Sequence, residues 1–204
     1  MFIGRINSTQ TIYVQIYLIS MRYNIVFVGA VGVGKSSIVK RYVNGKHDDN
    51  ALTTLAVDFI PMELDGISVS IWDTAGQERF KAITSSYFAR GHVFVLVHDI
   101  QESVGNLRTW YKEISAKGTP RHNPVVIVAS NKTDLHPFCE TEVTSWIQDH
   151  MFDHIYTSAI TGEGINNLFS KIHDAIVVHQ ADWLAPSLPA LPTGAAKSSP
   201  GCSC

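Results

Sequence analysis

The chain has 204 residues, of which 45% are hydrophobic and 17% charged, and its formal net charge is -2 at pH 7. This length fits one globular domain with short extensions, and the apolar fraction is sufficient for a sizeable core. Because the charge is nearly balanced and no run of Lys or Arg occurs, the composition argues against a nucleic-acid partner and against a polybasic membrane patch.

Cysteine is rare, and two of the three stand in the last three positions of the sequence: Cys139, Cys202 and Cys204. No disulfide framework can be drawn from them, and the spacings of zinc sites are absent. This favours a reducing, intracellular compartment. For Cys202 and Cys204 themselves, composition leaves three readings open: a disulfide or metal clip, reactive surface thiols, or attachment points for lipid.

Residues 1–20 contain one apolar stretch, Thr11–Ile19 (TIYVQIYLI). It is shorter than the roughly 20 residues of a membrane helix, and no small-residue cleavage site follows it, which disfavours a secretory signal. Met21 stands directly before the first strand that carries a motif, so we expect residues 1–20 to be an N-terminal extension. The alternation of TIYVQIYLI also fits an added edge strand, and the sequence does not separate these two readings or establish whether residues 1–20 belong to the mature protein.

The first half of the chain predicts a strand, a loop, a helix and a hairpin. Tyr23–Val28 is a short apolar run that ends in a glycine-rich turn, and a helical pattern starts at Ser36. Two strand-like runs follow, Val57–Glu63 and Ile67–Trp72, and the Asp-Gly pair at 65–66 between them is a strong hairpin signal.

The second half alternates strands and helices. Val93–Val97 and Val125–Ala129 are continuous apolar runs with a helical stretch at about Glu102–Ala116 between them, which indicates parallel strands covered on both faces. Three further elements are a helix near Glu140–His150, a strand at His154–Thr157, and a last helix with the apolar stripe Ile165, Leu168, Phe169, Ile172 and Ile176. After Gln180 the chain is rich in Pro, Ala, Ser and Gly, so we expect a globular domain over residues 21–180 and a flexible tail over 181–204.

Gly29–Ser36 reads GAVGVGKS and satisfies the phosphate-binding pattern G-x-x-x-x-G-K-[ST]. It lies where that motif needs to lie, after a strand and before a helix. Glycines let the backbone N–H groups converge on phosphate oxygens, Lys35 reaches the terminal phosphates, and Ser36 offers its hydroxyl to Mg²⁺. The sequence therefore predicts a nucleoside triphosphate with magnesium.

The base is predicted from two later segments. Asn131, Lys132 and Asp134 form N-K-x-D after a buried strand, and an aspartate can accept both N–H groups on the edge of guanine, a pair that adenine lacks. The Asn amide and the Lys stem would help to seat the ring. Ser158 and Ala159 follow the last strand and would place backbone N–H groups near guanine O6. This pattern favours GTP and disfavours an ATP-using enzyme.

With these motifs in place, the chain resembles the Ras superfamily of small GTPases, and the Rab branch in particular, over about Tyr23–Val178 and again in the tail. WDTAGQERF, residues 72–80, matches the second-switch signature of Rab proteins residue for residue, and Thr54 matches the threonine of the first switch. The resemblance implies the small G domain of P-loop NTPases, an α/β fold whose mostly parallel six-stranded sheet has one antiparallel edge strand and is flanked by helices.

The resemblance also implies residue roles. Gln77 would orient the attacking water, Thr54 would bind Mg²⁺ and sense the γ-phosphate, and Gly76 would bond that phosphate, with Gln77, Lys35 and Thr54 as the catalytic group. Mg²⁺ would be held by Ser36, Thr54 and Asp73. The nucleotide contacts implied are Gly29, Val31, Gly32, Val33, Gly34, Lys35, Ser36, Ser37, His47, Thr54, Asp73, Gly76, Asn131, Lys132, Asp134, Ser158 and Ala159.

Several positions depart from the family pattern. Val31 occupies a loop position that is usually small, and its branched side chain would point toward the space that Gln77 and an incoming arginine need. Either hydrolysis is slow, which would leave a GTP-loaded scaffold, or the loop shifts and nothing changes. His47 replaces an aromatic ring beside the base and Ala51 replaces a tyrosine, so we expect faster nucleotide release. The segment Asp99–Ser103 is shorter than usual, and we expect it to alter only a surface turn.

The resemblance also predicts partners and location. Rab proteins act with exchange factors, GTPase-activating proteins and effectors, and the aromatic trio Phe59, Trp72 and Tyr87 would contact the effectors unless it is plain core packing. The terminal Cys-x-Cys matches the pattern for two geranylgeranyl groups, which would attach Cys202 and Cys204 to a membrane with the help of prenylation and membrane-extraction chaperones. We therefore expect a switch in vesicle-mediated transport on the cytoplasmic face of intracellular membranes, with a cytosolic pool.

Overall fold

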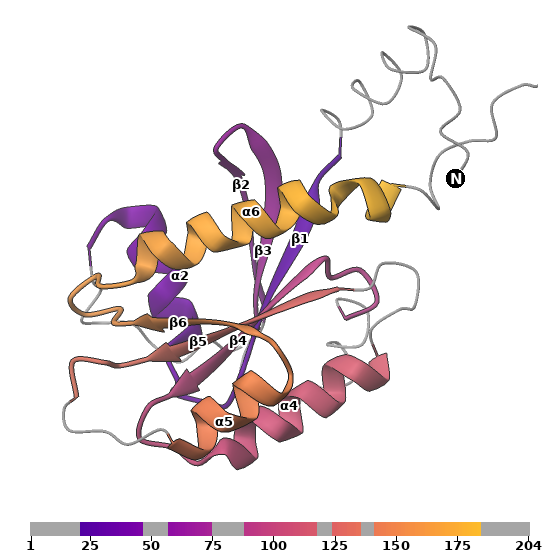
Figure 1. Cartoon of the computed structure of the whole chain (residues 1–204). Helices are drawn as coiled ribbons and strands as arrows, with labels where there is room; N and C mark the ends of the chain where they lie inside the picture. The colour runs from indigo at the N-terminus through magenta and orange to yellow at the C-terminus, as the bar shows by residue number, and fades with distance from the viewer. Residues whose placement is uncertain (1–20, 47–56, 75–87, 118–123, 136–140, 185–204) are drawn as a thin grey trace, which may run out of the picture.

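The computed structural model describes residues 21–46, 57–74, 88–117, 124–135 and 141–184 (Figure 1). These residues form a six-stranded sheet in the order β2-β3-β1-β4-β5-β6. The strands are β1 (Tyr23–Val28), β2 (Val57–Leu64), β3 (Ile67–Thr74), β4 (Val93–Asp99), β5 (Val125–Asn131) and β6 (Asp153–Thr157). All neighbouring pairs are parallel except β2 and β3, which form an antiparallel hairpin at one edge. The predicted fold is confirmed.

The hairpin turn follows from its two central residues. Asp65 has φ +46° and Gly66 has φ +83°, and two successive positive φ values are what a tight two-residue hairpin turn requires. The pair Asp-Gly tolerates them, which sets the register of β2 against β3.

Three strands continue two residues beyond the apolar runs that predicted them. β3 ends at Thr74, β4 at Asp99 and β5 at Asn131, because backbone ladder bonds do not depend on whether the side chain is apolar. The added residues are polar, and they stand at the carboxyl edge of the sheet. In open α/β sheets this edge is where ligands bind.

Helices cover the two faces of the sheet in pairs (Figure 1). α2 (Lys35–Asn44) and α6 (Ile165–Leu184) lie on one face, and α4 (Val104–Lys117) and α5 (Thr141–Asp149) lie on the other. β1 shows why two cores form, since Ile25 and Phe27 pack in the first core and Val26 and Val28 in the second. Every one of these side chains is fully buried, as expected of a central parallel strand.

The last helix runs past the predicted end of the domain. We expected a flexible tail from residue 181, but α6 continues to Leu184 and the Trp183 side chain is 1% exposed. The Trp183 ring lies 5.9 Å from the ring of Tyr23 and 5.1 Å from that of His92, measured between centroids. Burial of one large aromatic ring therefore attaches residues 181–184 to the domain.

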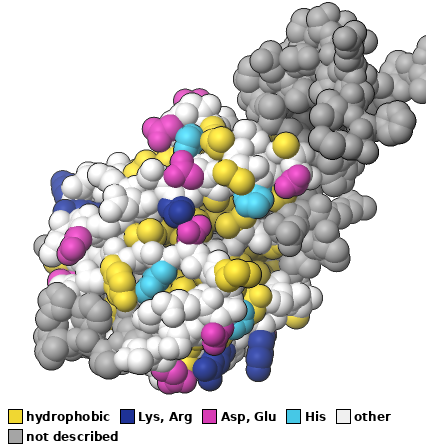
Figure 2. Space-filling model, viewed as in Figure 1, with side chains coloured by type: hydrophobic (Ala, Val, Ile, Leu, Met, Phe, Trp, Pro, Cys, Tyr) yellow, Lys and Arg dark blue, Asp and Glu magenta, His cyan; other side chains and the backbone are white. Residues whose placement is uncertain are grey.

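The surface of the described residues carries no concentrated positive charge on the face drawn in Figure 2, where Lys and Arg side chains lie dispersed among acidic ones. This agrees with the balanced composition. Within the described ranges, no helix is both long enough and apolar enough to cross a membrane.

Candidate nucleotide site

The loop between β1 and α2 curls back on itself at the carboxyl edge of the sheet. Its glycines have φ values of +149° at Gly29, +80° at Gly32 and +96° at Gly34, all of which disfavour an L side chain. A Cβ at Gly29 would lie 2.3 Å from the Val97 carbonyl oxygen, and one at Gly34 would lie 2.3 Å from Asn131 Nδ2. The loop therefore depends on glycine both for its curl and for its close approach to β4 and β5.

Lys35 is the first residue of α2, and its side chain folds back into this loop. The residue is 5% exposed, and Nζ donates to the carbonyl oxygens of Gly29 at 3.0 Å and Ala30 at 2.8 Å. Burial lowers the pKa of Lys35 to about 8, against the opposing effect of the Asp73 and Glu102 carboxylates. The Lys35 ammonium thus lies against the backbone of the loop, where it is suited to bind phosphate oxygens.

Asp73 lies beside the loop on β3, in register with Phe27 of β1. It is 2% exposed, and burial raises its pKa, while a hydrogen bond from the Ser36 side chain and the nearby Lys35 charge act in the opposite direction. Its Oδ1 has no hydrogen-bond partner among the described residues. A buried carboxylate oxygen next to a serine hydroxyl fits Mg²⁺, which takes oxygen ligands and keeps several waters.

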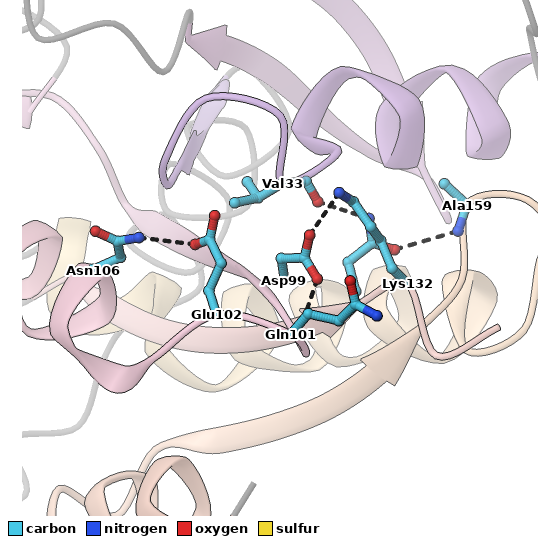
Figure 3. A network of polar contacts seen from close by, with 8 residues as sticks. Val33, Asp99, Gln101, Glu102, Asn106, Lys132 and Ala159 are labelled. Atoms are coloured by element: carbon cyan, nitrogen blue, oxygen red, sulfur yellow. Dashed lines mark hydrogen bonds and ion pairs between the residues drawn. The ribbon is translucent and has the colours of Figure 1, made fainter. Parts of the chain in front are cut away.

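Asn131 joins this loop to the loop after β6. It is 1% exposed, its Nδ2 donates to the Val33 carbonyl at 2.8 Å, and its Oδ1 accepts from the Ala159 N–H at 3.3 Å (Figure 3). Oδ1 also accepts from Thr157 Oγ1 at 3.2 Å. We expected this amide to help to seat the base. The bonds in the structure join Val33 of the first loop to Ala159 after β6, so Asn131 also connects the parts of the site.

Asp134 and Ser158 are joined by a hydrogen bond between their side chains. The Ser158 hydroxyl donates to Asp134 Oδ1 at 2.5 Å and accepts the Thr161 N–H at 3.1 Å. The Ser158 N–H is donated to the Glu163 carbonyl at 3.0 Å. We expected the N–H groups of Ser158 and Ala159 near guanine O6. The Ala159 N–H makes the longer and weaker hydrogen bond of the two, so it can more easily exchange that bond for one to a ligand.

The site thus has two parts, which we call the phosphate side (Gly29–Ser36 with Asp73) and the base side (Asn131–Asp134 with Ser158 and Ala159). A model of the Ras family matches residues 24–178 of the chain. The match covers both the phosphate side and the base side of the site. The chain belongs to the Ras family.

Two curated relatives place it more closely among small GTPases. The chain is 35% identical over 163 residues to GTP-binding protein YPTM2 from Zea mays, covering 76% of this chain and 79% of that relative. It is 31% identical over 167 residues to Ras-related protein Rab-18 from Lymnaea stagnalis, covering 78% and 82%. The protein is a Rab-like small GTPase that binds GTP and GDP with Mg²⁺ and hydrolyses GTP.

Membership in this family also indicates the classes of partner with which the protein acts. The GTPase acts with exchange factors, GTPase-activating proteins and effectors.

Val31, the unusual residue of the loop, is 48% exposed. Its backbone belongs to the phosphate side, and its side chain reaches solvent instead of packing in the core. Several other expected site residues lie outside the described residues of the GTPase: His47, Thr54, Gly76 and Gln77. Ser37, on α2, is partly buried.

Two of the three aromatic residues expected at the effector surface can be placed. The rings of Phe59 and Trp72 lie 4.7 Å apart between centroids on neighbouring strands of the hairpin, and Phe59 is 47% exposed. Trp72 Nε1 donates to Asn24 Oδ1 at 3.0 Å, which fixes the indole. The exposure of Phe59 argues against plain core packing at that position, while Tyr87 lies outside the described residues.

Two residues at the site were missed by the sequence reasoning. Asp99, which we assigned to a surface turn, is the last residue of β4, is 8% exposed, and pairs with Lys132. Arg41 on α2 donates from Nη2 to the Thr161 carbonyl at 2.8 Å and so supports the loop after β6. The one available signal was an acidic residue at the end of an apolar strand run, which marks the carboxyl edge of a parallel sheet.

Proposed function

We propose that the chain is a membrane-attached GTP/GDP switch of vesicle transport, with the phosphate side and the base side as its nucleotide site. One observation carries this proposal: Asn131 links the loop that holds Lys35 to the segment that holds Asp134 and Ser158, through bonds to Val33 and Ala159. This link supports the proposal, because it joins the loop of a buried lysine to the segment whose carboxylate would read the base.

On the phosphate side, the N–H groups of Gly32, Val33 and Gly34 and the Lys35 ammonium would bind the phosphates. Ser36 and Asp73 would hold Mg²⁺, together with Thr54 of the first switch. When bound, the metal neutralises charge on the β- and γ-phosphates. Burial of Lys35 at 5% exposure strengthens its interaction with the phosphates, since water screens it little.

The two switches complete the reaction in this proposal. Gln77 would orient the attacking water, and the N–H of Gly76 and the backbone of Thr54 would sense the γ-phosphate. Loss of that phosphate releases both segments and, with them, the effectors. Phe59, Trp72 and Tyr87 would form the aromatic part of the effector surface, and the half-exposed ring of Phe59 supports this role.

On the base side, Asp134 would accept the two N–H groups of guanine, and the Ser158 hydroxyl would hold that carboxylate in place. Ala159 would donate its N–H to O6, and Ser37, Lys132 and His47 would border the ring or the phosphates.

Asp134→Ala tests the proposed site through base selectivity. Inosine diphosphate has the ring N–H of guanine but lacks its exocyclic amino group. The wild type is expected to prefer GDP over inosine diphosphate by about tenfold, the value of one hydrogen bond to a charged group, and the variant is expected to lose this preference. Competition against a fluorescent GDP measures both. An unchanged preference in the variant would place the base elsewhere.

A second candidate function, a GTP-loaded scaffold that rarely hydrolyses, is favoured by Val31. Its branched side chain is 48% exposed, and the resemblance implies that it points toward the space that Gln77 and an incoming arginine need. Single-turnover GTP hydrolysis with and without an activating protein, compared between wild type and Val31→Gly, separates the two functions. If the wild type hydrolyses GTP at an ordinary stimulated rate that Val31→Gly does not exceed, Val31 does not impair the switch and the scaffold is excluded.

The membrane anchor is proposed to be a pair of geranylgeranyl groups on Cys202 and Cys204, added and later handled by prenylation and membrane-extraction chaperones. One chain gives only marginal membrane binding, and Lys197 is the only basic residue from 181 onward, so a second lipid is the signal that remains. The GTPase would then lie on the cytoplasmic face of intracellular membranes with a cytosolic pool. Mass spectrometry of the membrane-bound protein is expected to find both cysteines modified, and unmodified cysteines in that pool would refute the anchor.

A further inference from the structure

An ion pair connects the ends of two neighbouring strands beside the base side of the site. Lys132 Nζ lies 2.6 Å from Asp99 Oδ2 (Figure 3). Asp99 is the last residue of β4 and is in register with Asn131, the last residue of β5, which directly precedes Lys132. The pair therefore lies at the carboxyl edge of the sheet, next to the amide that joins the two sides of the site.

The backbone of Lys132 is held in an unusual conformation. Its φ is +70°, and the left-handed region costs a non-glycine residue about 1 kcal/mol. Bonds on either side maintain it: the Ile100 N–H donates to the Asn131 carbonyl at 3.1 Å, and the Leu135 N–H donates to the Lys132 carbonyl at 2.9 Å. The lysine stem thus leaves the strand end in a direction that β4 and the following turn determine.

The carboxylate is the fixed member of the pair. Asp99 Oδ1 accepts the Gln101 N–H at 3.0 Å, and the Asp99 carbonyl accepts the Glu102 N–H at 2.8 Å. The Asp99 side chain is 11% exposed and that of Lys132 is 32% exposed. The other acidic residue of this turn, Glu102, accepts from Asn106 at 2.9 Å instead (Figure 3). Hydrogen bonds within the turn therefore fix Asp99, and its carboxylate holds the Lys132 ammonium, which would otherwise move in solvent.

Fold stability alone does not account for this arrangement. Ion pairs on the surface contribute little, and the same chain has ordinary examples in Lys117 with Glu113 and Lys171 with Asp153. A free lysine side chain has about 2 kcal/mol of rotamer entropy, which is lost when a ligand orders the chain. Ordering it beforehand, next to Asn131 and two residues before Asp134, removes that cost from nucleotide binding.

We infer that Asp99 is a positioning residue for the nucleotide: by holding the Lys132 ammonium it keeps the lysine stem extended beside the base and so slows nucleotide release. The inference rests on the proposed base side of the site. It deepens that proposal by adding a residue that acts through Lys132 and has no contact with the phosphates.

A double-mutant cycle on the full chain tests the inference. Asp99→Asn keeps the shape of the side chain and an oxygen for the Gln101 N–H, and Lys132→Met keeps the stem without the ammonium. Dissociation of a fluorescent GDP, followed by stopped flow, is expected to be about fivefold faster in Asp99→Asn than in wild type. In the Lys132→Met background the same change is expected to have no further effect.

Two companion variants make the outcome specific. Asp99→Glu, which restores a carboxylate, is expected to recover part of the slow release. Asp153→Asn, which removes the carboxylate of a similar pair with Lys171, is expected to leave release unchanged. Recovery by Asp99→Glu together with no effect of Asp153→Asn is a pattern that a merely destabilised fold would not give.

The inference fails if Asp99→Asn releases GDP at the wild-type rate, or if it accelerates release equally with and without Lys132. Asp134→Ala in the same assay separates this failure from failure of the base site. If Asp134→Ala accelerates release and Asp99→Asn does not, the base site stands and only the role of Asp99 is wrong. If neither variant changes release, the base site is also misplaced.

Discussion

The phosphate side and the base side satisfy their polar groups in different ways. On the base side, both ends of the Asn131 amide, the Asp134 carboxylate and the Lys132 ammonium all have protein partners within hydrogen-bond or ion-pair distance. On the phosphate side, the Lys35 ammonium lies against two carbonyl oxygens, and Asp73 Oδ1 has no partner among the described residues.

The pKa shifts follow the same division. Burial lowers the pKa of Lys35 to about 8 and raises the pKa of Asp73, so in both residues burial disfavours the charged form at a cost to the folded state. That cost falls where the charged part of the nucleotide would bind, whereas the base side would receive a neutral ring. We infer that binding energy from phosphate and metal would offset an electrostatic cost already present in the fold.

The largest effect is expected from Lys35→Met. GDP affinity should fall about a thousandfold, since a buried charge-assisted contact with the phosphates is lost. Without nucleotide, the variant should unfold at a higher temperature than the wild type, because an apolar chain of similar length replaces a buried ammonium. Calorimetric titration and thermal unfolding measure the two effects.

Lys171→Met is the control, because the Lys171 side chain is 38% exposed and pairs with Asp153 at the start of β6. It is expected to change neither quantity. A nucleotide-free Lys35→Met protein that is less stable than the wild type would show that the phosphate side carries no electrostatic cost.

Asn131→Ala should damage the fold even without nucleotide. The change leaves the Val33 carbonyl, the Thr157 hydroxyl and the Ala159 N–H without their partner, and buried unsatisfied groups cost about 1 to 3 kcal/mol each. We expect the free energy of unfolding to fall by about 4 kcal/mol in denaturant titrations.

Asn106→Ala provides the comparison for that loss, because its side chain makes an exposed hydrogen bond to Glu102. Its effect should stay within about 0.5 kcal/mol. If the two variants lose equal stability, Asn131 does not connect the two sides of the site in the way described.

The free energy of unfolding should depend on pH through the lowered pKa of Lys35. Its pKa is about 8 in the folded protein and 10.5 as the reference value, so between these two pH values the unfolded chain binds the proton and the folded chain has released it. The free energy of unfolding therefore gains a contribution that rises with pH over this range, by at most about 3 kcal/mol.

Subtracting the profile of Lys35→Met isolates this contribution in nucleotide-free protein. The difference should be flat below about pH 7 and rise above pH 8. A difference that stays flat up to pH 10 would mean that Lys35 is not buried as described.

Much of this architecture was accessible from the sequence, and the exceptions have physical causes. Apolar runs identified β3, β4 and β5 but not their last two residues, since a ladder continues through Asp73, Asp99 and Asn131 irrespective of side-chain polarity. The composition change after Gln180 suggested a tail, yet Trp183 adds enough buried ring surface to extend α6.

Within the site, local motifs predicted which residues take part but not how they bond to each other. N-K-x-D indicated a base-binding role for Asn131, while its buried bonds to Val33 and Ala159 join segments that are far apart along the chain. The pairing of Lys132 with Asp99 is likewise a product of strand order, because β4 and β5 are neighbours in the sheet.

Thermal unfolding of the full chain with Mg²⁺ and either GDP or ADP tests whether the two sides together form a site that selects guanine. Both ligands present a diphosphate to the phosphate side, and only GDP fits the base side. GDP is expected to raise the unfolding temperature by more than about 5 °C over the nucleotide-free protein, and ADP at the same concentration is expected to have little effect. Equal stabilisation by GDP and ADP would contradict a base side preformed for guanine, and no stabilisation by either would contradict the whole site.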